Sequence, residues 1–576
     1  MHPRRSLFLA LALLSACAAA PPAGAATGND PLLGGGQGAA SAYLVGHVAM
    51  LEGDVAFAAK EFGAALGRDP SNMLLRQQAF LTCLMSDCTE ALPLARTLPG
   101  NQAAELLLAN HDAAAGNWAE AQKRFAALSG TAATEKFTAL MRQLLVAWAE
   151  AGAGKTDAAL ATLQPYTTGA RPQFLFVLHS AMIADLAGRT HEAARLYTTA
   201  QSEFGAPTLE LARLLASWQA RQGHSGMAAA TLKAAISRTP DLAIALPALV
   251  ASAKRPVIRN AADGLAEVYL ALAASLHQQA GGAVSLAMVR LALSLRPDDA
   301  AARLLGADLT AMDKNYQEAT RLLAPVPATD PLVGVVRLHR ATLAELSGNL
   351  DEALHEEEAL ARDYPNRPEP YVAQGDILRS QHHFKEAAAA YDKAIARLGT
   401  PSAVDWSVFY NRGIAYDRAG NWPAAEKDFL AALKLVPNEP FVLNYLGYSW
   451  TVQGRNLARA QQMIERAMAE DPSNGAIVDS LGWVLLRRGD VAAAVQQLQR
   501  AVELVPDDPT INGHLGDAYW ATGRKLEAFY QWRLALTLHP EADEVTRISA
   551  RLKEAEKALG IPPTPPAPAG APAAGK

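Results

Sequence analysis

One short segment of the chain has residue types that could bind a phosphate group. Gly152-Ala153-Gly154-Lys155-Thr156 ends in the glycine, lysine and threonine of a nucleotide-binding loop, in which backbone N–H groups and the lysine hold the phosphates. Such a loop also requires an earlier glycine, at the place where Ala149 stands, and a strand in front of it. The residues before Ala149 have the pattern of a helix instead. We therefore predict a turn between helices here and no nucleotide chemistry.

Histidines and carboxylates do not form another set of residues suited to chemistry. His382-His383 lies where other segments of the chain place a turn glycine, and no further ligands follow at metal-binding spacing. No Ser/His/Asp set and no pair of carboxylates stands out from the rest of the sequence. The sequence therefore predicts a protein that is not an enzyme, without cofactor or metal, and a solvated turn at the two histidines.

Cys83 and Cys88 are the two cysteines in the body of the chain. Within one helix their Cα atoms would be too far apart for a disulfide. Ser86-Asp87 lies where a turn between helices is expected, however, and a turn could fold Cys88 back. Two alternatives remain open: a structural disulfide, which an oxidising compartment allows, and two buried, inert thiols.

The elements that position these residues follow from a repeated pattern of small residues. Small side chains let two antiparallel helices approach each other, and one large residue fills the space between them. A glycine after the first helix accepts the left-handed conformation of a helix end, and a proline stops the second helix. Four consecutive copies have this order: Gly413, Gly420, Ala425, Phe429, Ala432 and Pro437; Gly447, Gly454, Ala460, Ile464, Ala467 and Pro472; Gly482, Gly489, Ala494, Leu498, Ala501 and Pro506; and Gly516, Gly523, Ala528, Trp532, Ala535 and Pro540.

The same pattern returns from Gly46 to Pro70, and weaker copies lie between. A period of about 34 residues with these residue types is typical of the tetratricopeptide repeat, and the sequence resembles that family. It predicts an all-α fold, a tetratricopeptide-repeat (TPR) α-solenoid in which antiparallel helix pairs stack into a right-handed superhelix and contact mainly their neighbours. The period slips between Ser252 and Asp263, so we expect N-terminal repeats at 41–252 and C-terminal repeats at 253–560.

The first residues resemble a bacterial lipoprotein signal. Two arginines precede the apolar stretch Leu7–Leu14, and Leu14-Ser15-Ala16-Cys17 has the order of a lipobox. The resemblance implies a signal peptide at 1–17, acylation of Cys17 and, with Ala18 after it, sorting to the outer membrane. The protein would then be lipid-anchored on the periplasmic face. An ordinary cleaved secretory signal and a soluble periplasmic protein are the alternative.

Composition sets further limits on the function. Segments rich in alanine, glycine and proline predict a flexible tether at 18–40 and a disordered tail at 561–576. The net charge of −5 is spread along the chain without a basic face, so we expect no nucleic-acid partner. Contact with a membrane is expected through the lipid anchor only.

A solenoid of this kind binds other proteins in the groove lined by the first helices of its repeats. In the four best copies, we expect the residues one place after and three places before the first glycine to face that groove. Aromatic residues with polar neighbours are frequent binding anchors, and the alternative is that the rings cover the interface between repeats. This rule predicts the groove residues Tyr410, Ile414, Asn444, Tyr448, Asp479, Trp483, Gly513 and Asp517, and Trp520 joins Tyr448 and Trp483 in an aromatic row.

Three runs give a closer resemblance: Asn444-Tyr445-Leu446-Gly447-Tyr448, Asp479-Ser480-Leu481-Gly482-Trp483-Val484 and Leu291-Ala292-Leu293-Ser294-Leu295-Arg296-Pro297-Asp298. With the lipobox, they make the chain similar to the outer-membrane TPR lipoproteins. This resemblance implies a non-enzymatic scaffold or adaptor that presents peptidoglycan hydrolases to a periplasmic carboxyl-terminal processing protease. The alternative is a structural subunit of an envelope assembly, for outer-membrane protein insertion or exopolysaccharide export.

Overall fold

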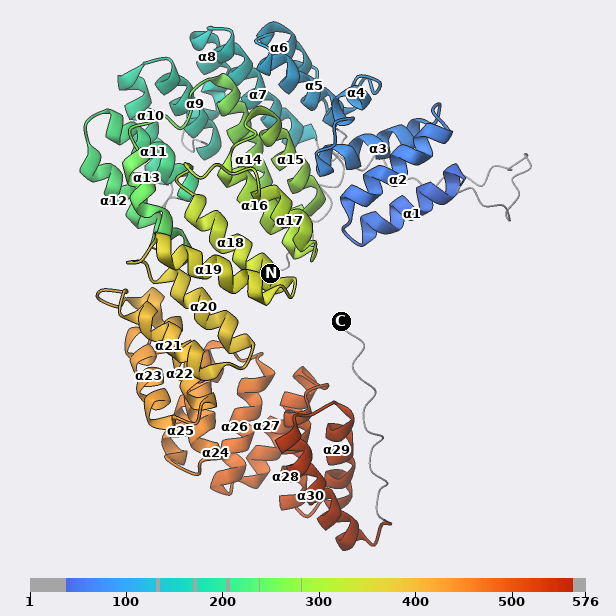
Figure 1. Ribbon diagram of the computed structural model, residues 1–576, viewed down its shortest axis with the longest axis vertical. Coiled ribbons are helices and arrows are strands. Elements are labelled where there is room, and N and C mark those ends of the chain that lie inside the picture. The colour runs from blue at the N-terminus through green and yellow to red at the C-terminus, as the bar shows by residue number, and fades with distance from the viewer. Residues whose placement is uncertain are drawn as a thin grey trace. The chain divides into compact units, whose positions relative to one another are not determined.

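The computed structural model describes residues 38–130, 135–168, 173–203, 208–237, 239–280 and 282–562. They divide into two compact units, unit 1 up to Ile377 and unit 2 from Leu378 (Figure 1). Every regular element in these ranges is a helix, which confirms the predicted all-α class. Cys17, the predicted tether up to residue 37 and the tail from residue 563 lie outside the described residues. The last two residues of the predicted tether belong to the first helix.

Unit 1 is built from helix pairs joined by short turns. A short 3-10 helix, η3 (Pro240–Ala245), precedes α13, and α20 runs from unit 1 into unit 2. The helices are α1 (Ala39–Leu51), α2 (Val55–Arg68), α3 (Met73–Ser86), α4 (Ala91–Ala95), α5 (Gln102–Ala114), α6 (Trp118–Ala126), α7 (Glu135–Gly152), α8 (Thr156–Thr167), α9 (Phe174–Leu186), α10 (Thr190–Glu203), α11 (Leu209–Arg221), α12 (Ser225–Ile236), α13 (Leu246–Ser252), α14 (Ala261–Ala280), α15 (Gly282–Leu295), α16 (Ala300–Met312), α17 (Tyr316–Leu323), α18 (Val333–Leu346), α19 (Leu350–Asp363) and α20 (Glu369–Ser380).

Unit 2 contains the four copies in which the repeat pattern is clearest. Its helices are α21 (Phe384–Ile395), the 3-10 helix η4 (Ala403–Asp405), α22 (Trp406–Arg418), α23 (Trp422–Leu435), α24 (Pro440–Val452), α25 (Leu457–Glu470), α26 (Gly475–Arg488), α27 (Val491–Leu504), α28 (Pro509–Ala521), α29 (Lys525–Thr537) and α30 (Ala542–Leu559).

The glycines of the pattern bring the two helices of a pair into contact. Gly413 on α22 faces the ring of Phe429 on α23, and a Cβ atom at Gly413 would lie 2.6 Å from that ring. Gly482 on α26 faces Leu498 on α27 in the same way, at 2.5 Å. Gly489 ends α26 with φ of 90°, a backbone conformation that side chains rarely adopt. The sequence pattern therefore predicted the helix pairs for the correct physical reason.

Unit 1 departs from the prediction that each repeat contacts mainly its neighbours. The helix pair α14 and α15 packs against α3, α5, α7 and α9, far earlier in the chain (Figure 1). Asn110 on α5 donates a hydrogen bond to the carbonyl oxygen of Leu291, at 3.1 Å, and accepts one from the hydroxyl of Tyr269, at 2.9 Å. Further along, the Asn315 amide donates to the carbonyl oxygen of Gly53, at 3.1 Å. Unit 1 therefore adds contacts between distant repeats to those between neighbours, because its later helices pack back onto α3, α5, α7 and α9 and share one core with them.

The burial of α15 on all sides explains these contacts with distant helices. All ten residues from Val284 to Leu293 are buried, and a helix that is buried all round needs neighbours on every side. The predicted boundary between Ser252 and Asp263 consequently falls inside unit 1, and the chain passes into unit 2 after Ile377. None of the helices in the described ranges combines the length and the apolar character that a membrane crossing requires.

Candidate functional site

The first helices α24, α26 and α28 of the repeats in unit 2 lie side by side. α24 contacts α26, and α26 contacts α28, although a second helix separates each of these pairs in the chain. Their free side therefore forms one continuous face, which we call the inner face of unit 2. All the predicted groove residues lie on α22, α24, α26 or α28.

Two of the predicted residues pack inside the interface between helices. The ring of Tyr410 lies 6.0 Å from those of both Phe429 and Tyr445, and burial raises the pKa of its hydroxyl to about 12. Trp520 packs against Trp532 of α29, with ring centroids 5.6 Å apart. The rings of Tyr410 and Trp520 therefore cover the interface between helices, which is the alternative that the sequence left open.

Asp479, another predicted groove residue, is 4% exposed. Both of its carboxylate oxygens lie 2.9 to 3.0 Å from Nδ1 of His514 on the next first helix. The His514 ring stacks on Trp483, with centroids 4.1 Å apart and an angle of 15° between the planes. Because both oxygens already have this partner, Asp479 positions the His514 and Trp483 rings and is not itself free for a ligand.

Three polar groups beside this stack have no partner within the described part of the chain. Oδ1 of Asn444 and Nε1 of Trp483 are buried without a hydrogen bond. The Tyr448 ring lies 6.3 Å from the His514 ring, and burial, followed by the charge of Asp479, raises the pKa of its hydroxyl. Buried polar atoms without partners cost about 1–3 kcal/mol each. An incoming chain with backbone donors and acceptors could pair with the Tyr448 hydroxyl directly, and with the two buried atoms of Asn444 and Trp483 once their side chains turn toward it.

The other side of this surface is charged. Asp517 on α28 pairs with Arg547 of α30 and lies 3.5 Å from Nε of Arg551. Arg547 also pairs with Glu544, at 2.8 Å. A Cβ atom at Gly513 would lie 2.7 Å from the Arg547 guanidinium, so the absence of a side chain at Gly513 makes room for it. We call Asn444, Tyr448, Trp483, His514, Asp517 and Arg547 the inner-face cluster.

Sequence analysis missed two members of the inner-face cluster. His514 lies between the predicted positions of its helix, one residue beyond Gly513, which is the position that corresponds to Asp479 in the next repeat. Arg547 belongs to α30, which follows the last copy of the pattern. A signal for it was available in Glu544 and Arg547, whose spacing places a salt bridge on one helix face.

The structure joins Cys83 and Cys88 in a disulfide, with Cα atoms 5.0 Å apart. Asp87 between them has φ of 62°, and the N–H of Cys88 donates to the carbonyl oxygen of Cys83 at 3.0 Å. This turn folds Cys88 back onto the end of α3. Of the two alternatives that the sequence left open, the structure has the disulfide.

The two segments that resembled chemical motifs are turns. Gly154, with φ of 76°, lies between α7 and α8, and Lys155 beside it is exposed. His382, with φ of 63°, lies exposed between α20 and α21 and packs against Phe384. Both motif-like segments therefore lie in turns between helices, as the repeat pattern predicted.

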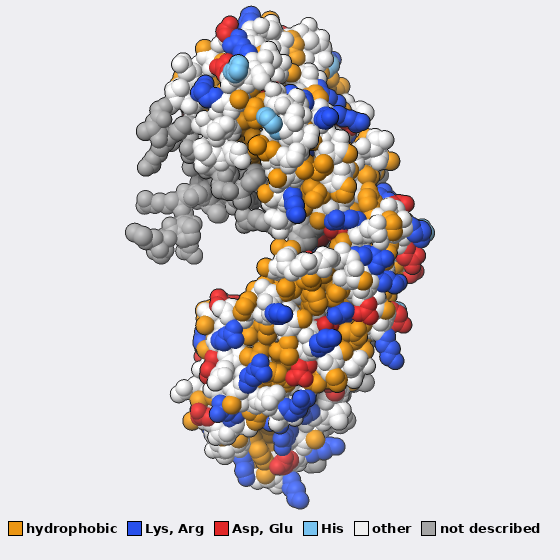
Figure 2. Space-filling view, turned by 90° about the vertical axis from the view of Figure 1, so that its left-hand side faces the viewer, with side chains coloured by type: hydrophobic (Ala, Val, Ile, Leu, Met, Phe, Trp, Pro, Cys, Tyr) orange, Lys and Arg blue, Asp and Glu red, His pale blue; other side chains and the backbone are white. Residues whose placement is uncertain are grey.

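On the face that Figure 2 shows, Lys and Arg side chains are scattered among apolar and acidic ones.

Comparison with known proteins agrees with this geometry. Residues 372–440, 451–509 and 480–543 match the model of the tetratricopeptide repeat family. The chain therefore contains tetratricopeptide repeats between residues 372 and 543, and such repeats indicate a scaffold for protein–protein interactions.

Curated relatives match this chain only over parts of their length. A TPR repeat-containing protein of Pseudomonas aeruginosa is 26% identical over 172 residues, which are 30% of this chain and 28% of that protein. Cellulose synthase operon protein C of Xanthomonas axonopodis pv. citri is 31% identical over 137 residues, 22% of this chain and 9% of that protein. Aspartyl/asparaginyl beta-hydroxylase of Homo sapiens is 23% identical over 195 residues, 32% of this chain and 25% of that protein.

Solved structures are similar to this chain in fold. The match to Cut9–Hcn1, a hetero-tetramer of the APC/C, covers 90% of this chain and 96% of that chain, at 17% identity and a TM-score of 0.37. The match to YrrB, a TPR protein with an unusual peptide-binding site, covers 30% of this chain and 86% of that chain, at 19% identity and a TM-score of 0.26.

Proposed function

We propose that this protein is a non-catalytic adaptor that holds an extended protein segment on the inner face of unit 2. One observation carries the proposal: Asn444, Tyr448 and Trp483 lie on the neighbouring first helices α24 and α26, and buried polar atoms of Asn444 and Trp483 have no partner in the described part of the chain. An extended segment offers one backbone donor and one acceptor per residue, which suits an amide, a hydroxyl and an indole N–H. The rings of Tyr448 and Trp483 would supply apolar contact area at small cost in side-chain entropy.

The charged side of the inner-face cluster would set the direction of the bound segment. Arg547 and Arg551 share Asp517, and their side chains are 30% and 47% exposed. A segment with an acidic residue could pair with an exposed guanidinium without separating it from Asp517, because one guanidinium has five N–H donors. We therefore expect bound segments to carry Asp or Glu beside an apolar or aromatic residue.

The cellular part of the proposal rests on the sequence. Acylation of Cys17 would anchor the protein in the outer membrane, and the tether at 18–40 would let the repeats pivot on the periplasmic side. Holding a peptidoglycan hydrolase in one place and a carboxyl-terminal processing protease in another would raise their effective concentration for each other. The chemistry would then belong to the protease.

A pull-down from detergent-solubilised envelopes tests both parts. Wild type is compared with Tyr448→Ala/Trp483→Ala, and Tyr530→Ala is the matched control because that ring is 58% exposed on α29. We expect a periplasmic protease and hydrolases with wild type and with Tyr530→Ala. We expect at least about tenfold less hydrolase with the double variant, because buried aromatic anchors carry most of the binding energy.

Two further measurements keep this test decisive. Circular dichroism checks that the double variant is folded, and Asn444→Ala, which leaves both rings in place, must also weaken binding. Recovery of an insertion or export assembly in stoichiometric amounts, unaffected by all three variants, would replace the adaptor by a structural subunit. Equal recovery of hydrolase by all variants would show that the inner face of unit 2 is not the binding surface.

A further inference from the structure

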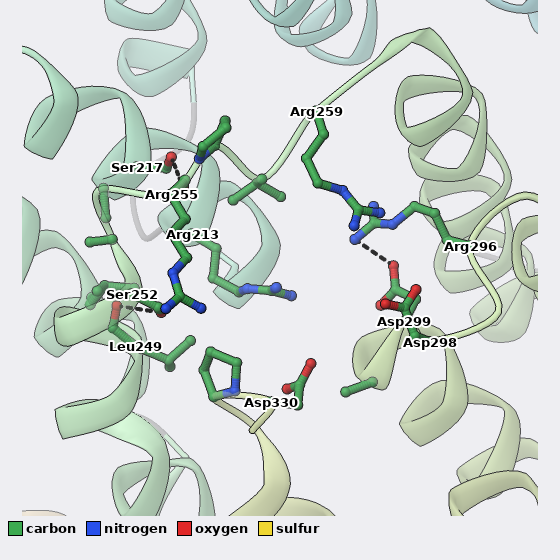
Figure 3. A pocket seen from close by; sticks show the side chains of 17 residues that line it. Arg213, Ser217, Leu249, Ser252, Arg255, Arg259, Arg296, Asp298, Asp299 and Asp330 are labelled. Carbon is green, nitrogen blue, oxygen red and sulfur yellow. Dashed lines mark hydrogen bonds and ion pairs between the residues drawn. The ribbon is translucent and has the colours of Figure 1, made fainter. Parts of the chain in front are cut away.

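Unit 1 contains a pocket of about 240 Å³ whose wall is rich in charge (Figure 3). Its lining includes four arginines and three aspartates. They come from α11, from the segment after α13 and from the loops before α16 and α18. The segment after α13 is the place where the repeat period slips. We call this cavity the unit 1 pocket.

Two of the four arginines are paired with acidic residues. Arg296 lies 2.5 Å from Glu267 and 2.8 Å from Asp299, and Arg259 lies 2.9 Å from Asp263. Except for Arg259, the side chains of this ion cluster are less than a tenth exposed. Buried charges need such partners because losing water is costly for them. The ion cluster therefore forms one wall of the pocket, in which most of the charges balance one another.

Arg213 and Arg255 are different. No hydrogen bond or ion pair joins either guanidinium to another described residue. Arg213 is half-buried on α11, and Arg255 is held by its backbone, whose carbonyl oxygen accepts a hydrogen bond of 2.8 Å from Ser217. In Figure 3 both side chains come from the same side of the unit 1 pocket. Two guanidinium groups with free donors form a site for an oxygen anion.

In Figure 3 Asp298 stands across the pocket from Arg213 and Arg255, and Asp330 stands at the lower edge of the pocket. Asp298 is exposed and has no partner among the described residues. Asp330 accepts one hydrogen bond, 2.7 Å long, from the N–H of Leu332, and it has no cation at ion-pair distance within the described ranges. Burial raises the pKa of the Asp330 carboxyl, and the hydrogen bond from Leu332 and the charge of Arg213 offset part of this effect. A cationic group placed beside Asp330 would favour its ionised form.

We infer that the unit 1 pocket binds a small zwitterion of the amino-acid class, with its carboxylate on Arg213 and Arg255 and its ammonium group on Asp298 and Asp330. The facing acids argue against a multiply charged anion such as phosphate, because like charges a few ångströms apart repel each other. The volume of the unit 1 pocket lies below the range of about 300–1,000 Å³ that is typical of sites for drug-sized ligands, so a smaller ligand fits it better. Free amino acids and dipeptides share the required chemistry, since both carry one ammonium and one carboxylate group.

Isothermal titration calorimetry on the full chain tests this inference. The probes are the free amino acids, a set of dipeptides, acetate, methylammonium and inorganic phosphate. We expect at least one zwitterion to bind more than tenfold more tightly than acetate, methylammonium or phosphate. Tighter binding of either free amino acids or dipeptides then shows which of these two classes of zwitterion the pocket prefers. Tightest binding of phosphate, or no binding of any zwitterion, would overturn the inference.

Four variants locate the site. Arg213→Gln and Arg255→Gln should each weaken binding at least tenfold, and so should Asp330→Asn, whose amide oxygen can still accept from Leu332. Arg195→Gln is the matched control, because Arg195 is exposed on α10 and its side chain has no partner among the described residues. Unchanged binding by the three pocket variants, or an equal loss in Arg195→Gln, would place the ligand elsewhere. Because the inner-face cluster belongs to unit 2, these results do not depend on the proposed adaptor function.

Discussion

At the scale of single residues, buried polar groups divide into those with partners and those without. Asp479 and His514 are both buried, and they satisfy each other. Glu357 on α19 is fully buried, and neither of its carboxylate oxygens has a hydrogen-bond partner among the described residues. Removing Asp479 would leave the buried Nδ1 of His514 unpaired and lower the stability. Removing the carboxylate of Glu357 would instead remove a buried group that has no partner, and would raise the stability. The two residues therefore predict opposite effects on stability.

Glu357→Gln should stabilise unit 1 at alkaline pH. Burial, with the charge of Glu356 next, raises the pKa of Glu357 from 4.5 to about 9. Between these two values the folded chain keeps the proton and the unfolded chain releases it, so the free energy of unfolding falls as the pH rises, by up to about 1.4 kcal/mol per pH unit. Urea unfolding at pH 5 and pH 8 measures the loss, and the variant should lose less.

Glu358→Gln is the control for this prediction, because Glu358 is the next residue on α19 and is exposed. Its unfolding at both pH values should match wild type within about 0.5 kcal/mol. If Glu357→Gln and Glu358→Gln lose the same unfolding free energy between pH 5 and pH 8, the Glu357 carboxyl is ionised in the folded protein. It would then be stabilised by a bound water or another partner.

Asp479→Ala should destabilise unit 2 by about 1–3 kcal/mol, because Nδ1 of His514 then loses its acceptor in a buried place. The stack of His514 on Trp483 should loosen, with a shift in tryptophan emission. Asp507→Ala is the control, since Asp507 is exposed between α27 and α28. Urea unfolding followed by circular dichroism measures both variants. Equal stability of the two would show that Asp479 is not needed to position His514.

At the scale of elements, the repeat pattern predicted the helix pairs because it records contacts within a pair. Gly413 and Phe429, or Gly482 and Leu498, touch across one turn, so their types depend on each other at fixed spacing. The contact of α15 with α3 and α5 has no such spacing. The sequence indicates it only through the mostly apolar residues of α15, which the structure buries on all sides. The free polar groups of Asn444, Tyr448 and Trp483 also depend on neighbouring helices. The sequence therefore predicted the face of the candidate site but could not predict which of its side chains are free.

Two glycine substitutions separate close packing from helix propensity. Alanine stabilises a helix interior by about 0.5–1 kcal/mol relative to glycine. Gly63→Ala on α2 should show this gain, because a Cβ atom there would meet no atom within 4 Å. Gly482→Ala should instead destabilise unit 2 by about 1–3 kcal/mol, since its Cβ atom would lie 2.5 Å from Leu498. Thermal unfolding measures both, and a gain at Gly482 would contradict the close approach of α26 and α27.

At the scale of the whole molecule, the two units differ in how their helices share contacts. Unit 1 has a large core that reaches from α3 to α19, because α14 and α15 join its early and late helices, and it has smaller clusters at α1–α3 and at α18–α20. Unit 2 has separate smaller cores along its stack, one around α22–α27 and another around α27–α30. In an open stack, stability is close to a sum of terms for each repeat and its neighbours. A closed unit, by contrast, has contacts that cross many repeats and unfolds as one body.

The two units should therefore respond differently to a local change. Leu265→Ala on α14, a fully buried residue of the unit 1 core, should cost about 2–5 kcal/mol. Because α14 contacts α5, α7 and α9, faster hydrogen exchange should appear in all of these helices. Gly482→Ala should speed exchange in α26, α27 and the helices beside them, and leave α22 as in wild type. Exchange followed by mass spectrometry at low urea resolves these helices. If Leu265→Ala affects only α14 and α15, the long-range contacts of unit 1 contribute little to its stability, and unit 1 behaves as an open stack too.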